Sequence, residues 1–486
     1  MYSPEYIICD NYLYFNFPEW NKHATNHNIW ICPKYAEKID RVKININSDE
    51  SDNKIIRGTD NLIFIDKQLL LKLEINEDKE KIIVPLEDEF KTVIPDEDIQ
   101  SSYNIEENIL KEYKFIEAFK EYTIKQNLYY SYEDLINLHV CMKTNPITIL
   151  AGMSGTGKSE LANYYAKMVK ASEEKGTLLF LPITPSYTEP GDILGFLNNT
   201  TGLFSPSETG FTDFLIHAKN NQDLMHIVIF DEMNLSQVEY WFAPFISLLE
   251  KKEDERTLNL YSHNAHCINN QSYPASIQIK DNIKFIGTVN IDETTKDFSD
   301  RLLDRANVIN LRKEKLSKLK ESLAEKNTNE QYKDFRCESY KIYKEWIKNN
   351  RWYEVYSNEE INFLDDLHDL MNKFDIQKGV SFRISKKIAE FILNIPFDLE
   401  GKNLISRDVA FDLQIKQRII TKIKGTEKQY GKLIGVIKDN SENEPKGSEL
   451  YNFFNSENAK LISDFKLTKQ EIIRKAKELG VYGYAN

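Results

Sequence analysis

A glycine-rich stretch at residues 149–167, ILAGMSGTGKSELANYYAK, constrains this chain more than any other part of its sequence. It fits the pattern G-x-x-x-x-G-K-[ST] at every fixed position, with a short apolar run before it and an amphipathic run after it. In a strand–loop–helix unit of this kind, backbone N–H groups and the positive end of the helix converge on one point, which favours a bound phosphate. The alternative is a glycine-rich turn that binds nothing.

The loop also carries the side chains that a nucleotide phosphate needs. Lys158 can reach the β- and γ-phosphates, and the Ser159 hydroxyl can hold Mg²⁺. Gly155 and Gly157 permit the tight backbone turn. We therefore predict a set of nucleotide-binding residues: Gly152, Ser154, Gly155, Thr156, Gly157, Lys158, Ser159 and Glu160.

Two carboxylates follow a second apolar run, at residues 225–230. Asp231 and Glu232 lie at the end of this predicted parallel strand, and Asp231 comes 73 residues after Lys158. We predict that Asp231 holds Mg²⁺ through its water shell, and that Glu232 orients and polarises an attacking water. The alternative is an acidic strand end that meets solvent.

A polar residue ends the next predicted strand, residues 283–289. If this strand lies beside the carboxylate strand, Asn290 can touch the γ-phosphate or its attacking water. The alternative is an ordinary turn residue at the end of a strand.

Three arginines are candidates for contact with a nucleotide. Arg301 and Arg305 stand one turn apart on a short helix predicted at residues 298–306. An arginine presented to a neighbouring subunit would neutralise charge in the transition state. The alternative is that both pair with nearby acids, at positions 297, 300 and 304. Arg383 lies at the start of a later helix, and is either a contact from a lid or a surface charge.

Composition narrows the class of protein. A chain of 486 residues is too long for a single core, and its 41% hydrophobic and 12% aromatic residues suffice for globular packing. The net charge of -13 gives no overall basic field of the kind that indicates nucleic-acid binding. A local basic lining around DNA is still compatible with this balance.

Cysteine usage and the N-terminus favour a cytoplasmic protein. The five cysteines are scattered and form no C-x-x-C pair, so we expect reduced thiols and no zinc site. The first residues lack a basic start and a long apolar run, so we expect no signal peptide. No window approaches the apolar length of a membrane span.

Patterning divides the chain into three predicted parts. Residues 1–104 contain short β-branched and aromatic runs separated by Asn, Asp, Gly and Pro, which predicts a β-rich N-terminal module. Residues 105–312 are predicted to form the α/β nucleotide-binding domain with a helical lead-in, and residues 313–486 a helical lid and C-terminal helical region. The first part could read a target or serve packing or oligomerisation, and no motif decides between these roles.

The order of these signals resembles an AAA+ ATPase domain. Three stretches resemble the McrB-like branch in particular: ILAGMSGTGKSELA, IFDEMNLSQVEYWFAPFISLLE and FIGTVNIDETTKDFSDRLLDRANVINL. Two further stretches, VSFRISKKIAEFI and VAFDLQIKQRIITKIKG, resemble the lid helices of that group. McrB-like proteins are the nucleotide-driven motor subunits of modification-dependent restriction systems. The resemblance covers residues from about 125 to 430 and leaves out the first hundred.

The resemblance implies an α/β fold, with a P-loop AAA+ core on a parallel sheet and a C-terminal helical lid. Lys158 and Ser159 match the P-loop pair. Asp231 and Glu232 match the metal and water residues, and Asn290 matches the sensor. The resemblance also implies a homo-oligomeric ring, hexameric in this family, with nucleotide held between subunits. It implies DNA and a separate McrC-like nuclease as partners, and no membrane.

The sequence departs from the family at one place that bears on which nucleotide base, adenine or guanine, is bound. GTP-using members carry M-N-T-A-D-R-S, where this chain has VNIDETT at residues 289–295. The Asn is kept and the Asp–Arg pair is not, and the N/T-K-x-D type of guanine reader is missing. We therefore favour ATP over GTP, bound with Mg²⁺.

Three functions compete on this evidence. The leading hypothesis is a ring motor that hydrolyses nucleoside triphosphates in DNA restriction or phage defence. No PD-(D/E)-x-K signature is found, so we predict that the chain holds no nuclease site of its own. The alternative is a MoxR-like remodelling chaperone with the same fold and site, indifferent to DNA. A third possibility, a nucleotide switch with little turnover, is disfavoured by Glu232.

Overall fold

The chain divides into two units, Met1–Glu107 and Asn108–Asn486. The computed structural model describes residues 96–290, 298–324, 334–438 and 444–485, with eight short strands before them. Strands β1, β2, β5 and β8 pair in that order in an antiparallel sheet, and β3–β4 and β6–β7 are two-stranded pairs. Their bounds are β1 Tyr6–Cys9, β2 Tyr12–Phe15, β3 Asn21–Lys22, β4 Trp30–Ile31, β5 Ile39–Lys43, β6 Ile55–Arg57, β7 Ile63–Ile65 and β8 Glu80–Ile82. The β-rich module over residues 1–104 stays a prediction.

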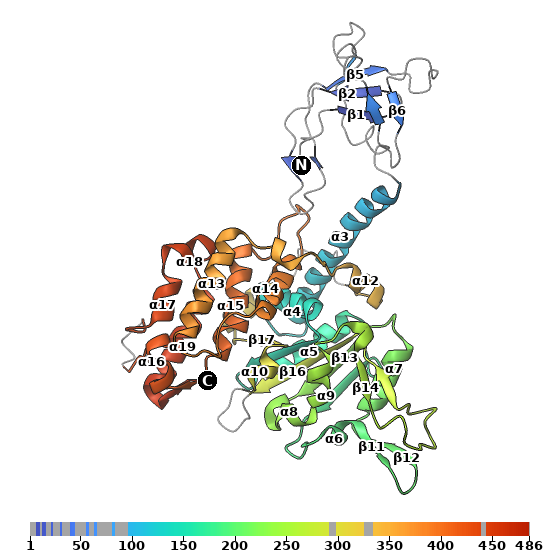
Figure 1. Cartoon of the computed structure of the whole chain (residues 1–486), viewed down its shortest axis with the longest axis vertical. Coiled ribbons are helices and arrows are strands. Elements are labelled where there is room, and N and C mark those ends of the chain that lie inside the picture. The colour runs from blue at the N-terminus through green and yellow to red at the C-terminus, as the bar shows by residue number, and fades with distance from the viewer. Residues whose placement is uncertain are drawn as a thin grey trace. The chain divides into compact units, whose positions relative to one another are not determined.

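A five-stranded parallel sheet is the centre of the second unit (Figure 1). Its strand order is β10-β13-β16-β9-β17, and every neighbouring pair is parallel. The strands are β9 Ile147–Gly152, β10 Leu178–Pro182, β13 His226–Asp231, β16 Ile283–Asn290 and β17 Asn307–Asn310. Because parallel strands share a carboxyl edge, the residues that end β9, β13 and β16 meet there.

The apolar character of these segments explains why they form buried strands of the sheet. β13 (HIVIFD) and β16 (IKFIGTVN) are buried from their first residue to their next-to-last, as expected for strands covered on both faces. Helices follow or join the strands: α5 Lys158–Met168, α6 Pro190–Leu194, α7 Phe211–Asn220 and α10 Asp300–Leu303. The predicted strands and their order along the chain are therefore confirmed for the described residues.

Residues 233–248 form three short helices instead of one continuous helix. They are η2 Met233–Leu235, α8 Val238–Trp241 and α9 Ala243–Leu248. Pro244 lies in the first turn of α9, where its missing N–H is tolerated, and its ring disfavours a continuous helix through the preceding residues. Apolar side chains of this segment are buried, including Trp241 and Phe245.

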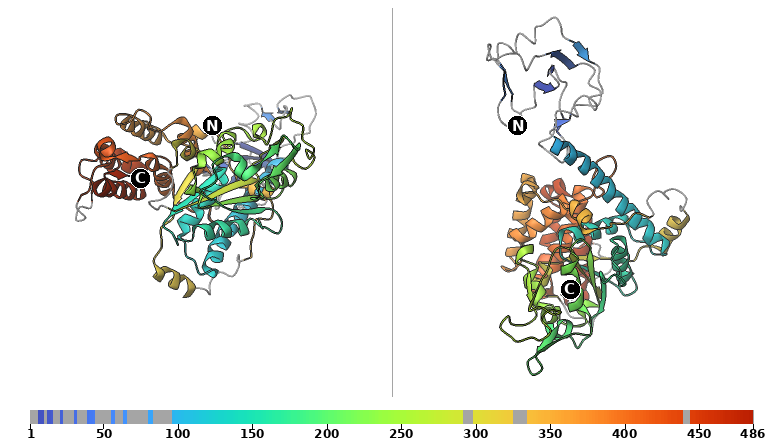
Figure 2. Two further views of the ribbon diagram at one scale, coloured as in Figure 1. Left: turned by 90° about the horizontal axis from the view of Figure 1, so that it is seen from below. Right: turned by 90° about the vertical axis from the view of Figure 1, so that its right-hand side faces the viewer.

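Two hairpins extend from this unit. β11 Gly195–Asn198 pairs with β12 Leu203–Pro206, and β14 Thr257–Asn259 pairs with β15 Ser276–Gln278. Figure 1 and the right-hand view of Figure 2 show the β11–β12 hairpin, in green, pointing away from the parallel sheet. A short 3₁₀ turn, η3 Glu253–Glu255, precedes β14.

Helices lie on both sides of the sheet in the sequence of the second unit. Helix α3 (Asp96–Lys125) and helix α4 (Tyr132–Thr144) precede the sheet. The C-terminal helices, orange to red in Figure 1, gather beside the sheet. The elements after β17 are α11 Leu316–Ala324, α12 Tyr340–Glu345, η5 Trp352–Glu354, α13 Asn358–Asn372, α14 Phe382–Leu393, α15 Arg407–Arg418, η6 Ile420–Lys422, β18 Gly425–Thr426, α16 Glu427–Ile434, α17 Glu449–Phe454, α18 Glu457–Ile462, α19 Lys466–Tyr482 and β19 Tyr484–Ala485.

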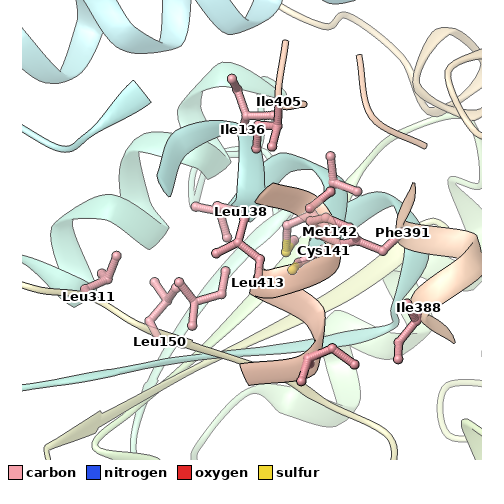
Figure 3. Close-up of a cluster of buried hydrophobic side chains, with 14 of the residues drawn as sticks. Ile136, Leu138, Cys141, Met142, Leu150, Leu311, Ile388, Phe391, Ile405 and Leu413 are labelled. Atoms are coloured by element: carbon pink, nitrogen blue, oxygen red, sulfur yellow. The ribbon is translucent and has the colours of Figure 1, made fainter. Parts of the chain in front are cut away.

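One apolar core joins the sheet to these helices (Figure 3). It combines side chains from α4, β9, α14 and α15 with the residues just after β17. The side chains labelled in Figure 3 are Ile136, Leu138, Cys141, Met142, Leu150, Leu311, Ile388, Phe391, Ile405 and Leu413. The C-terminal helices therefore belong to the same packed body as the strand that leads into the glycine-rich loop. In the described part of the chain, no helix combines the length and the apolar character needed to cross a membrane.

Candidate nucleotide-binding site

The glycine-rich loop turns sharply between β9 and α5. Gly155 and Gly157 have φ angles of 77° and 82°, in the left-handed region that residues with a Cβ rarely adopt. Gly157 is the N-cap of α5, so the first free N–H groups of that helix face the loop. Lys158 is buried, and its Nζ donates hydrogen bonds to the carbonyls of Gly152 at 3.1 Å and Met153 at 2.8 Å. The ammonium group therefore lies against the loop backbone.

Other members of the predicted loop set differ in their surroundings. The Thr156 hydroxyl donates to the Met153 carbonyl at 2.9 Å, which closes the loop on itself. Ser154 and Glu160 are exposed at the loop and at the first turn of α5. A Cβ on Gly152 would lie 2.7 Å from the Leu311 carbonyl oxygen, so this position leaves no room for a side chain.

The loop and the carboxylate strand come into direct contact. The Ser159 hydroxyl donates a hydrogen bond to Asp231 Oδ1 at 2.6 Å, across 72 residues of sequence. The Thr288 hydroxyl donates to the same oxygen at 2.7 Å. Two hydroxyls and one carboxylate therefore form a compact group of oxygen atoms at the end of β13. Oxygen ligands of this kind suit Mg²⁺, which is commonly bound by one or two carboxylates, substrate phosphates and several waters.

Glu232 is held in an unusual backbone conformation next to this group. Its φ of 52° and ψ of 47° are left-handed, which is uncommon for a residue other than glycine, asparagine or aspartate. Its N–H donates to Thr288 Oγ1 at 3.0 Å, and the Asn290 side-chain amide donates to Glu232 Oε1 at 2.9 Å. The Asn234 side chain in turn donates to the Asn290 carbonyl at 3.1 Å. Strain of this type is found where surrounding contacts fix a side chain for function.

The parallel register explains why these residues meet. Asn290 lies opposite Gly152 in the β16–β9 pair, and β13 is the other neighbour of β16. The predicted neighbourhood of β13 and β16 is thus confirmed by the structure. Thr288 and Asn290 are two residues apart in β16, so they lie on the same face of the strand. The chemical roles predicted for Lys158, Ser159, Asp231, Glu232 and Asn290 remain predictions.

The three candidate arginines form a separate group. Arg305 and Arg383 both bind Glu250 Oε1, at 2.6 and 2.8 Å. Arg301 is exposed and donates to the Ser247 hydroxyl at 3.1 Å. Of the local acids considered for the alternative pairing, Asp300 and Asp304 pair with Lys378 and Lys422 instead. Asp297 lies outside the described residues.

The structure adds residues that sequence reasoning did not single out. Thr288 contacts both carboxylate residues, Glu250 bridges two of the arginines, and the Tyr130 hydroxyl donates to the Gly157 carbonyl at 2.8 Å. A usable signal existed only for Thr288, since it shares a strand face with Asn290. Most of the segment used for the base preference, residues 291–297, lies outside the described part of the chain.

This arrangement is chemically suited to phosphoryl transfer to water. It combines a phosphate-binding backbone with a buried ammonium group, an oxygen cluster for a divalent cation and a carboxylate oriented by an amide. Among the described residues, no group of three or more His, Cys, Asp and Glu side chains is placed to hold a metal ion. A cation here would therefore depend on Ser159, Asp231, water and the phosphates themselves.

Comparison with known proteins adds little to this picture. Residues 330–484 match a family described as a domain of unknown function, DUF8727. No curated protein matches the chain. Among solved structures, a protein from Cytophaga hutchinsonii that was proposed to be an ATPase is 15% identical, with a TM-score of 0.44. The match covers 66% of this chain and 91% of that one. At this identity and TM-score the likeness assigns no activity.

Proposed function

We propose that the chain is a nucleoside triphosphatase of the AAA+ type, and that it acts as a McrB-like ring motor. The observation that carries the proposal is the hydrogen bond between Ser159 and Asp231. Glu232 follows Asp231 in the chain, and its carboxylate accepts a hydrogen bond from the Asn290 amide. In this proposal the loop N–H groups and Lys158 bind the phosphates of ATP, or of GTP as the second choice. Glu232 accepts a hydrogen bond from the attacking water and orients it toward the γ-phosphate. Mg²⁺, when bound, neutralises charge on the phosphates.

The arginines support a shared site between subunits of a homo-oligomeric ring. Arg301 is exposed, so a neighbouring subunit can be reached without breaking an ion pair in this one. The Arg305 side chain is only 9% exposed and paired with Glu250, so Arg301 is the stronger candidate for contact with a neighbour's nucleotide. Arg383 is half exposed on the first turn of α14 and is the candidate contact from the C-terminal helices.

The biological setting of the proposal is DNA restriction or phage defence in the cytoplasm. It rests on the resemblance of the three quoted stretches to McrB-like proteins, and it implies DNA and a separate McrC-like nuclease as partners. The hexameric ring rests on the same resemblance, whereas the preference for ATP rests on the departure from the GTP-using members at residues 289–295.

One observation favours a MoxR-like remodelling chaperone as a second candidate. Residues 193–207 and 257–279, which contain the two hairpins, have no Asp, Glu, Lys or Arg, although 29% of the whole chain is charged. The two segments are joined where Ile268 N–H donates to the Gly202 carbonyl at 2.7 Å. Phe196 and Ile268 are exposed there. DNA binding depends on cationic side chains, so this projecting surface suits an uncharged polypeptide better than a nucleic acid.

The experiment that tests the proposal is hydrolysis of ATP and GTP by the purified chain, with and without duplex DNA. The motor hypothesis predicts Mg²⁺-dependent release of phosphate that DNA accelerates. Hydrolysis that DNA leaves unchanged, together with acceleration by an unfolded polypeptide, would select the chaperone. Absence of nucleotide binding and hydrolysis under all these conditions would refute both. DNA cleavage by the chain alone would contradict the prediction that it holds no nuclease site.

A further inference from the structure

The turn between α3 and α4 lies against the glycine-rich loop. Tyr130 is buried in this turn, and its hydroxyl donates a hydrogen bond to the Gly157 carbonyl at 2.8 Å. The same carbonyl accepts the first helical hydrogen bond of α5, from Leu161 N–H at 2.8 Å. A carbonyl oxygen has two lone pairs, so both donors can be accommodated. The contact connects segments 27 residues apart.

Because of the geometry of the peptide bond, the contact of Tyr130 with the Gly157 carbonyl also orients the Lys158 N–H. In a planar trans peptide, the C=O and the following N–H point in opposite directions. Fixing the Gly157 carbonyl toward Tyr130 therefore fixes the Lys158 N–H away from Tyr130. That N–H is one of the first donors of α5 and belongs to the set that a bound phosphate uses. Without the Tyr130 hydroxyl, the helical hydrogen bond from Leu161 N–H would be left to hold this peptide, next to a glycine whose backbone is more flexible than that of other residues.

The surroundings keep Tyr130 in place. Ser131, next in the chain, caps α4, and its Oγ accepts a hydrogen bond from Asp134 N–H at 3.1 Å. Helix α3 packs on α5 through edge-on aromatic pairs, Tyr122 with Tyr164 at 5.4 Å and Phe119 with Tyr165 at 5.6 Å between ring centroids. Burial raises the pKa of Tyr130, so its hydroxyl keeps the proton that it donates.

Tyr130 and Gly157 also fit one another sterically. A Cβ on Gly157 would collide with the Tyr130 hydroxyl and would lie 3.5 Å from Leu128. The tyrosine therefore occupies the space that a side chain at position 157 would need. Together with the positive φ of Gly157, this accounts for glycine at this place in the loop.

We infer that Tyr130 is a positioning residue for the phosphate site, which orients the Gly157–Lys158 peptide before nucleotide binds. The inference rests on the proposed function and adds to it a contact from outside the loop motif. The contact preorganises the loop for binding. Without the hydroxyl, the loop of the nucleotide-free chain samples orientations that cannot bind phosphate. The apparent affinity for nucleotide then falls in proportion to the fraction of molecules that keep the binding orientation.

The test is the substitution Tyr130→Phe, which removes one oxygen and keeps the ring. We expect the Kd and KM for Mg·ATP to rise by about 2- to 10-fold, the range that corresponds to one hydrogen bond, with kcat within twofold of wild type. Without nucleotide, hydrogen exchange of the peptide covering residues 152–160 should become faster. The matched control is Tyr132→Phe at the first residue of α4, because the Tyr132 hydroxyl donates to Glu117 at 2.6 Å and not to the loop.

The outcomes separate this inference from the proposed function. Equal Kd, KM and exchange in Tyr130→Phe and Tyr132→Phe would overturn the positioning role. A fall in kcat with unchanged KM would also overturn it, since preorganisation acts on binding. Lys158→Ala, measured alongside, tests the site itself: if this variant binds Mg·ATP as wild type does, the proposed function fails whatever Tyr130 does. A melting temperature for Tyr130→Phe close to that of wild type excludes general unfolding as the cause.

Discussion

The side-chain amide of Asn290 donates a hydrogen bond to the Glu232 carboxylate at 2.9 Å, between the ends of two neighbouring parallel strands. The contact leaves the second carboxylate oxygen of Glu232 available to a water molecule. It therefore orients the one carboxylate of the site that is not already bonded to the loop serine.

Glu232→Gln tests the role of that carboxylate. The amide cannot accept the proton that the attacking water must lose, so we expect kcat for ATP hydrolysis to fall by about 10²- to 10⁴-fold. Nucleotide affinity should stay close to wild type, because the side chain of Glu232 is bonded to Asn290 and not to the glycine-rich loop. Glu255→Gln, at an exposed position, is the control for loss of one negative charge. Turnover by Glu232→Gln at the wild-type rate would refute the assignment.

Thr288→Val tests the hydroxyl that supports both carboxylate residues. The substitution leaves Glu232 N–H without its acceptor and Asp231 without one donor, so we expect a loss of about 1–3 kcal/mol in the free energy of unfolding. Denaturant unfolding measures this loss, and Thr288→Ser should restore most of it.

The neighbouring strand supplies a matched control for this measurement. Thr148 in β9 is also fully buried, but its hydroxyl has no hydrogen-bond partner among the residues that the structure describes. Thr148→Val should therefore be neutral or stabilising. Equal changes in the free energy of unfolding in both valine variants would show that the hydrogen bonds of Thr288 do not stabilise the fold.

Glu250 is expected to form a stronger ion pair with Arg305 than with Arg383. The Arg305 side chain is 9% exposed and that of Arg383 is 50% exposed, so solvent screens the second pair far more strongly. Double-mutant cycles with Glu250→Gln should give a larger coupling energy with Arg305→Gln than with Arg383→Gln. The energy for the exposed pair should be about 0–1 kcal/mol. The reverse order would show that Arg305 is not held by this ion pair.

Because of His226, at the start of β13, we expect the stability of the fold to fall in acid. Burial lowers the pKa of His226 to about 4, from 6.5. Between these values the unfolded chain binds more protons than the folded chain, so stability falls as the pH drops from 6.5 toward 4. His226→Gln should flatten this part of the profile of unfolding free energy against pH, whereas His263→Gln, at an exposed position, should not. An unchanged slope in His226→Gln would contradict the assignment.

The α/β fold and the strands β9, β13 and β16 could be predicted from the sequence because both are encoded locally, whereas β17 was not predicted. Buried strands are short apolar runs, and the loop motif ties Gly157, Lys158 and Ser159 to a strand before and a helix after. The proximity of Asp231, Glu232 and Asn290 followed from the rule that parallel strands share a carboxyl edge.

Other features depend on tertiary packing and could not be read from the sequence. Glu250 lies at the end of a short helix that Pro244 separates from the preceding one, and its pairing with Arg383 spans 133 residues. The contact of Tyr130 with Gly157 depends on how α3 packs on α5, which no local pattern specifies. The pairing of Asp300 with Lys378, between α13 and α14, and of Asp304 with Lys422, at the end of η6, likewise depends on contacts distant in sequence.

The most direct test of the account is binding and hydrolysis of Mg·ATP by the full chain, compared with the variant Lys158→Ala. Equilibrium binding of labelled ATP and release of inorganic phosphate would be measured on the same samples, with melting temperatures as a check on folding. The account predicts that the wild-type chain binds and hydrolyses ATP, and that the folded variant does neither to a comparable extent. A wild-type chain without nucleotide binding, or a variant that binds and hydrolyses ATP equally well, would contradict it.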